Sequence, residues 1–246
     1  MESGDARLGW AVAVNVGLTV AQVVGGALSG SLALVADAIH NLSDAGSLLI
    51  ALLARRIGRR PADERMTFGY GRAEVVAALI NLTTLIVIGL YLVYEAVVRF
   101  FAPEPIGGWV MIWVAGIALV VDLATAALTY RMSKGSLNVR AAFLHNVADA
   151  LGSVAVIVAG GLILLFGWTV ADPIVTLLIA GYVLWHGFAE IGESIRILMG
   201  ATPSDLDVEE VAGAMAAVPG VSSVHHLHVW ALDEHRRSLE AHVVID

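Results

Sequence analysis

The segment HNLSDA, at His40–Ala45, decides how this chain folds, because HNVADA repeats its pattern at His145–Ala150. The first copy lies in the apolar stretch Ser31–Leu53 and the second in Val139–Phe166. Either stretch is long enough to cross a bilayer, which takes about 20 residues. In a helix, residues four apart lie on the same face. The repeat therefore predicts two membrane helices that each carry a histidine and an aspartate side by side.

The composition extends this prediction to the rest of the chain. Of 246 residues, 58% are hydrophobic and only 15% are charged, with a mean hydropathy of +0.81, which is typical of membrane helices. Four more stretches could span a membrane: Leu8–Leu28, Arg72–Phe100, Trp109–Tyr130 and Asp172–Leu198. With a net charge of −8, nothing in the sequence suggests nucleic-acid binding, which needs a basic face. The chain has no cysteine, so a metal must be held by His, Asp, Glu or backbone oxygen.

Basic residues predict the orientation. The loop after the second span carries five arginines, and the loop after the fourth carries Arg131 and Lys134. The loops after the first and fifth spans carry no basic residue. Because positively charged loops stay in the cytoplasm, we expect both termini there.

The acidic tail predicts a second domain. We expect a transmembrane domain over residues 1–200 and a cytoplasmic domain over residues 201–246. In the tail, Ser204 or Asp205 can cap a helix that runs to Ala217, followed by strands at Val221–Leu232 and Ser238–Ile245. Within the first strand, the sequence predicts strict alternation, with the even-numbered His226, His228 and Trp230 on one face. A helix and two strands cannot cover a core, so we expect this domain to be incomplete.

The paired residues predict a metal site. By helical rise, His40 lies about 14 Å along its span, and His145 and Asp149 lie about 9 and 15 Å along theirs. Because the two spans run antiparallel, the pairs can meet near mid-membrane. Two imidazoles and two carboxylates suit tetrahedral Zn²⁺, with cobalt, cadmium, iron and manganese as alternatives. The competing interpretation is an ordinary buried polar contact between helices. Asp37 shares the face of His40 and either widens the ion path, relays a proton, or hydrogen-bonds a neighbouring helix.

The chain resembles the cation diffusion facilitator family of zinc/proton antiporters. The resemblance covers almost the whole chain and rests on five motifs: SGSLALVADAIHNLSD at Ser29–Asp44, RPADERMTFGYGRAE at Arg60–Glu74, LHNVADALGSV at Leu144–Val154, ADPIV at Ala171–Val175 and HHLHVWAL at His225–Leu232. It implies a six-helix transmembrane domain in the inner membrane, a cytoplasmic ferredoxin-like α/β domain, and a homodimer.

The resemblance also implies a transport site for Zn²⁺ formed by His40, Asp44, His145 and Asp149. His225 and His242 fall where relatives bind zinc in the cytoplasmic domain, although further ligands would lie beyond Asp246. The loop after the second span has no histidine, so a second, interfacial zinc site is not carried over. Two rival functions remain. An intramembrane metalloenzyme would need a motif such as H-E-x-x-H, which the sequence does not contain. The second rival function is a metal sensor that does not transport its ion.

Overall fold

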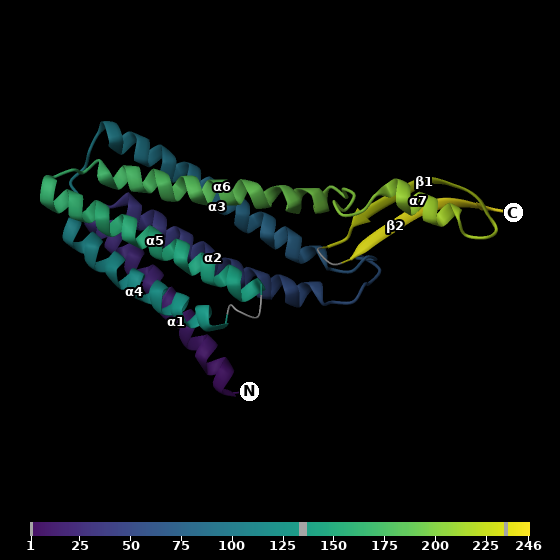
Figure 1. The fold of residues 1–246 in the computed structure, drawn as a ribbon, viewed down its shortest axis with the longest axis horizontal. Coiled ribbons are helices and arrows are strands. Elements are labelled where there is room, and N and C mark those ends of the chain that lie inside the picture. The colour runs from purple at the N-terminus through teal and green to yellow at the C-terminus, as the bar shows by residue number, and fades with distance from the viewer. Residues whose placement is uncertain (1, 133–136, 234–235) are drawn as a thin grey trace. The chain divides into compact units, whose positions relative to one another are not determined.

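The computed structural model describes residues 2–132, 137–233 and 236–246 (Figure 1). Its elements are α1 (Glu2–Ser29), α2 (Leu32–Gly58), α3 (Arg72–Phe101), α4 (Gly108–Met132), α5 (Leu137–Phe166), α6 (Ala171–Leu198), α7 (Val208–Ala216), β1 (Val221–Ala231) and β2 (Arg237–Ile245). Each predicted apolar stretch falls on one of α1 to α6. Four of the helices begin within one residue of the predicted start, whereas α1 begins six residues before Leu8 and α5 begins two residues before Val139. Lys134 of the loop after α4 lies outside the described residues.

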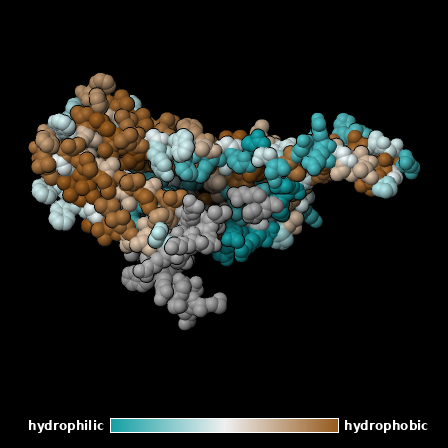
Figure 2. Space-filling model, in the orientation of Figure 1, coloured by the Kyte–Doolittle hydropathy of each residue, from teal (hydrophilic) through white to brown (hydrophobic). Residues whose placement is uncertain are grey.

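Apolar length identifies the membrane-spanning part. Among the residues that the structure describes, four helical segments are long and apolar enough to cross a membrane: Arg72–Phe101, Gly108–Ala127, Phe143–Phe166 and Ala171–Leu198. The visible surface of this helical region is largely hydrophobic (Figure 2). The chain therefore has a helical transmembrane region followed by a C-terminal domain with a small two-stranded sheet.

The chain divides into two compact units. The first comprises Met1–Gly46 and Thr84–Gly187, and the second comprises Ser47–Thr83 and Phe188–Asp246. The core of the first unit is built largely from small and medium side chains: Ala33, Leu34, Met111, Ala115, Val156, Ala159, Ile163 and Ala171. Small residues let membrane helices approach closely, and van der Waals contact then replaces the hydrophobic effect as the source of stability. At Gly160 of α5, an added Cβ would lie 2.8 Å from Ile112 of α4, so this contact needs a glycine.

The start of α2 is fixed by a side chain from α6. Asp172 is completely buried, and its carboxylate accepts hydrogen bonds from the Ser31 hydroxyl (2.5 Å) and from the amides of Leu32 (2.9 Å) and Ala33 (3.2 Å). Ser31 in turn accepts from the Leu34 amide (3.1 Å). The first amides of a helix have no partner within the helix, and here side chains satisfy them. Gly30 allows the sharp turn from α1 because its φ is +72°.

The C-terminal domain corrects two details of the sequence prediction. The helix α7 is capped by Asp207, whose side chain accepts from the Glu209 amide (2.8 Å), and not by Ser204 or Asp205. Pro203 and the turn that follows it occupy the positions where the earlier cap was expected. The strands β1 and β2 pair antiparallel, but a bulge between His225 and His228 interrupts the predicted alternation, with His226 at φ 51°. A bulge adds one residue to a strand and so changes the faces of the residues around it.

Candidate metal centre

The four paired residues converge in the first unit. His40 and Asp44 lie on α2, and His145 and Asp149 lie on α5. The two residues of each pair are four positions, or about one helical turn, apart. One ligand atom from each residue lies within 4.8 Å of the other three. The antiparallel pairing of two i,i+4 faces thus brings two imidazoles and two carboxylates together.

The contacts between the helices are shorter than the contacts within each helix. His145 Nε2 lies 3.0 Å from Asp44 Oδ2, and His40 Nε2 lies 3.3 Å from Asp149 Oδ1. Within one helix, His145 lies 3.5 Å from Asp149, and His40 lies 3.7 Å from Asp44. Each histidine therefore contacts most closely the aspartate of the opposite helix, which we call the crossed contacts.

These distances suit a tetrahedral ion. Ligands about 2.05 Å from a four-coordinate zinc lie about 3.3 Å from one another at the corners of a tetrahedron. The four nitrogen–oxygen distances here, from 3.0 to 3.7 Å, bracket that edge length. Two nitrogen donors also argue against Ca²⁺ and Mg²⁺, which prefer six or more oxygen ligands. The donor set and its spacing thus match zinc and similar transition metals.

Burial differs across the four residues. The side chain of Asp149 is only 8% exposed and that of His40 14%, whereas Asp44 and His145 are 40% and 43% exposed. His40 Nδ1 and Asp149 Oδ1 are buried, and neither makes a well-aligned hydrogen bond with any described residue. Buried polar atoms are normally satisfied, so an acceptor oxygen that faces an imidazole across 3.3 Å is consistent with a cation between them.

A cavity of about 330 Å³ adjoins the deeper half of the cluster. Its lining includes Asp37, His40 and Asp149, together with Tyr182 of α6. The Tyr182 ring meets the His40 ring edge-on, with centroids 6.1 Å apart. Nothing in the sequence around Tyr182 suggested this position, because it depends on how α6 packs against α2.

Asp37 takes part in a hydrogen-bond chain within the first unit. Gln22 of α1 donates to its carboxylate (2.6 Å), and Asn41 of α2 donates to Gln22 (3.0 Å). The alternative of a hydrogen bond to a neighbouring helix is therefore confirmed for Asp37, and its role in an ion or proton path stays a prediction. Gly152 leaves room for this carboxylate, since a Cβ there would lie 3.4 Å from Asp37 Oδ1.

A second carboxylate near the cluster belongs to α4. Asp122 is buried and accepts a hydrogen bond from the Ser153 hydroxyl of α5 (3.1 Å). Ser153 lies one turn beyond Asp149 on the same helix. It therefore joins α4 to the helix that carries half of the cluster.

The two histidines of the C-terminal domain lie opposite each other in the hairpin. His225 of β1 pairs in register with His242 of β2, and their ring centroids are 5.4 Å apart. His226, displaced by the bulge, brings its ring to 5.1 Å from His242. Within the described residues, the only group of three or more candidate ligands is the one on α2 and α5. Metal binding by His225 and His242 stays a prediction.

Two family models match this chain. The family model described as the cation efflux transmembrane domain matches residues 10–199, and the model described as the cytoplasmic domain of cation efflux proteins matches residues 203–246. The cadmium, cobalt and zinc/H(+)-K(+) antiporter of Bacillus subtilis (strain 168) is 40% identical over 94% of this chain and 75% of its own length. The zinc transporter ZitB of Escherichia coli (strain K12) is 42% identical over 93% and 74%, and the metal cation efflux system protein CzcD of Cupriavidus metallidurans is 40% identical over 96% and 75%.

Proposed function

The chain belongs to the cation diffusion facilitator, or cation efflux, family, and from this premise we propose that it exports Zn²⁺ from the cytoplasm in exchange for protons. The family consists of transporters, so the metalloenzyme alternative falls away. Two relatives support zinc as the cargo by their names, and one of these names also includes cadmium and cobalt. The name of a third relative specifies metal cations in general.

The proposed transport site is the set His40, Asp44, His145 and Asp149. The observation that carries the proposal is the tetrahedral spacing of the crossed contacts, 3.0 and 3.3 Å between side chains of different helices. The more exposed Asp44 and His145 would meet an arriving ion first, and the buried Asp149 and His40 would complete its shell. Four protein ligands leave no open coordination position, which favours carriage of the ion over chemistry upon it.

Proton exchange follows from the chemistry of these ligands. Zinc binds a neutral imidazole and an ionised carboxylate, so binding releases any protons that the four groups hold. Where the proton concentration is high, protons compete with the ion and displace it. Where it is low, the site loses protons and binds zinc again. Asp37, in the cavity beside His40 and Asp149, is proposed to lie on the path of the ion or the proton.

We propose the following arrangement in the cell. The six helices α1 to α6 each cross the inner membrane, with both termini in the cytoplasm. Support comes from the arginines of the loop after α2, since basic loops stay on the cytoplasmic side. The C-terminal domain is proposed to adopt a ferredoxin-like fold and to join two copies into a homodimer. The name of the family model for that domain, a cytoplasmic domain, is consistent with this placement.

Zinc flux in reconstituted vesicles tests the proposal. Wild-type protein in proteoliposomes should move zinc against a zinc gradient when a proton gradient of the opposite direction is imposed. Cadmium, cobalt, iron and manganese, tested in parallel, define selectivity. Metal binding without counterflow of zinc would replace the transporter by a metal sensor. Zinc flux that ignores the proton gradient would leave a facilitated-diffusion carrier.

A further inference from the structure

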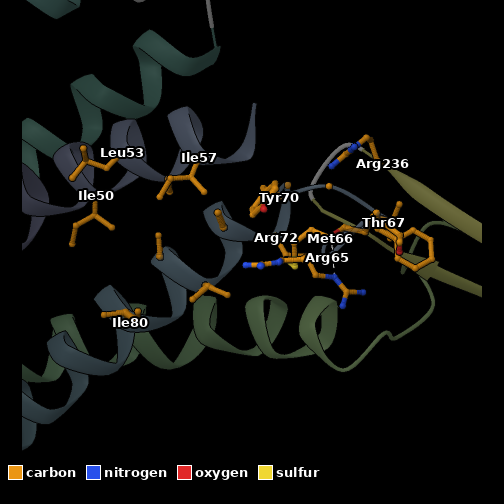
Figure 3. A pocket seen from close by; sticks show the side chains of 18 residues that line it. Ile50, Leu53, Ile57, Arg65, Met66, Thr67, Tyr70, Arg72, Ile80 and Arg236 are labelled. Carbon is orange, nitrogen blue, oxygen red and sulfur yellow. Dashed lines mark hydrogen bonds between the residues drawn. The ribbon is translucent and has the colours of Figure 1, made fainter. Parts of the chain in front are cut away.

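One cavity is lined only by residues of the second unit and shares no residue with the metal cluster. Its volume is about 610 Å³, within the range of about 300–1,000 Å³ that is usual for sites of small ligands. Apolar side chains of α2 and α3 form one wall, among them Ile50, Leu53, Ile57 and Ile80 (Figure 3). The loop between these helices forms the other end, together with Leu232 just after β1 and Arg236 just before β2.

The polar end of this cavity carries positive charge only. Arg65, Arg72 and Arg236 line it, and none of the lining residues is acidic. Arg236 is paired with Asp233 (2.6 Å), and Arg72 donates to the Leu232 carbonyl (3.3 Å). Neither Arg65 nor Arg72 forms an ion pair with any residue in the described part of the chain. Two arginines that form no ion pair among the described residues therefore line one end of an apolar groove.

Acidic residues nearby do not cancel this charge. Asp63 and Glu64 directly precede Arg65 in the sequence, and neither lines the cavity. Asp63 accepts hydrogen bonds from the Tyr70 hydroxyl (2.7 Å) and from the amides of Arg65 and Met66 (2.8 Å each). These bonds hold the loop in its turn. Four further arginines, Arg55, Arg56, Arg59 and Arg60, follow the apolar part of α2 and keep the local charge strongly positive.

The groove lies where a helix leaves the bilayer. The apolar run of α2 gives way to arginines at its last turn, and clustered basic residues of this kind mark the boundary between hydrocarbon and headgroups. Most of the apolar wall remains accessible, since Leu53 is 56% and Ile80 58% exposed. Guanidinium groups bind phosphate through paired hydrogen bonds.

We propose that this groove binds one anionic phospholipid, with an acyl chain along α2 and α3 and the phosphate between Arg65 and Arg72. Charge complementarity selects this occupant: an anionic lipid brings a net negative charge to Arg65 and Arg72, whereas a zwitterionic lipid brings a cationic group together with its phosphate. A second copy of the chain carries the same arginines and would bring like charges together at the polar end.

Lipid binding to the purified full chain tests the proposal. Delipidated protein in detergent is titrated with phosphatidylglycerol or phosphatidylcholine of identical acyl chains, and bound lipid is counted by native mass spectrometry. Phosphatidylglycerol should bind in preference to phosphatidylcholine. Removing one guanidinium, in Arg65→Gln, should weaken phosphatidylglycerol about fivefold, which corresponds to about 1 kcal/mol for one basic residue at a membrane surface. Binding of phosphatidylcholine should not change.

Two control variants change residues of the same type that lie outside the cavity lining. Arg56→Gln removes the same charge from the same basic run but outside the cavity lining, so it should leave phosphatidylglycerol binding as it is. Leu53→Trp should fill the groove and displace lipid, whereas Leu52→Trp, also exposed on α2 but outside the lining, should not. Each pair tests the groove independently, so if a variant of one pair folds poorly, the other pair still tests the proposal.

Three outcomes would overturn the proposal. Equal effects of Arg65→Gln and Arg56→Gln would indicate a diffuse attraction between the membrane and the whole basic run. Competition by glycerol phosphate at the concentration of the lipid would indicate a site for free phosphate compounds. A change of oligomeric state in Leu53→Trp, with lipid binding intact, would indicate that a second copy occupies the groove.

Discussion

Removal of the Asp172 carboxylate should destabilise the transmembrane helices at one defined point. In Asp172→Ala, the amides of Leu32 and Ala33 lose their acceptor, and these residues are 7% and 0% exposed. An unsatisfied buried polar group costs about 1–3 kcal/mol, so the two amides together cost about 2–6 kcal/mol. Because the first turn of α2 can fray towards water, we expect the lower part of this range, about 2–4 kcal/mol.

Thermal unfolding of the purified protein measures this loss. For a chain of this length, about 2–4 kcal/mol lowers the unfolding midpoint by about 5–15 °C. Asp172→Asn keeps one acceptor oxygen but turns an amide donor towards a backbone donor, so it should fall between wild type and alanine. Glu193→Ala, on the same helix but 64% exposed, is the control and should shift the midpoint little.

Hydrogen exchange locates the effect. The amides of Leu32, Ala33 and Leu34 should lose protection in Asp172→Ala before the rest of the helix does. Zinc affinity should fall less than in a variant that lacks a ligand, because His40 lies two turns beyond the cap. A midpoint for Asp172→Ala equal to that of Glu193→Ala would refute the reasoning, since it would mean that the buried amides find another acceptor at no cost.

Three further results are expected of the metal cluster. Asp149→Asn keeps the shape of a buried ligand but removes its charge, so a folded variant should lose zinc transport, and wild-type flux in it would exclude Asp149 as a ligand. His40→Asp changes the donors from two nitrogens and two oxygens to one and three, so the ratio of cadmium to zinc flux should rise, and an unchanged ratio would show that this position does not set selectivity. Zinc affinity should fall with decreasing pH, by roughly hundredfold between about pH 7.5 and about pH 5.5 if two imidazoles with the ordinary pKa of about 6.5 must each lose a proton, and calorimetry in buffers of different ionisation heat would count the protons released. An affinity independent of pH would contradict proton exchange at this site.

The pairing of His40 with Asp44 and of His145 with Asp149 could be predicted from sequence because it depends only on helical period. Their meeting across two helices followed from counting spans and from the distribution of arginines. The crossed contacts could not be predicted, because sub-ångström differences between neighbouring side chains depend on how α2 and α5 are rotated about their axes.

Other features depend on contacts that sequence patterns do not encode. Asp172 caps α2 from 140 residues away, and a hydropathy pattern shows it only as a carboxylate at the start of an apolar stretch. Asp207 prevails over Ser204 and Asp205 as the cap of α7 because Pro203 and its turn precede it, a choice that residue preferences alone leave open. The bulge at His226 depends on the register in which β1 and β2 pair. The alternation of residues within one strand does not reveal that register.

Because of the crossed contacts, metal coordination depends on the alignment of α2 and α5 along their axes. Either helix alone offers an ion one histidine and one aspartate, which is half of a coordination shell. A displacement of one helix by a single turn, about 5.4 Å, would separate both crossed contacts at once, because each joins one helix to the other. All four ligands can therefore reach the ion together only when the two helices are aligned in this way. The bound ion would in turn link α2 to α5, and its release would allow the two helices to move relative to each other.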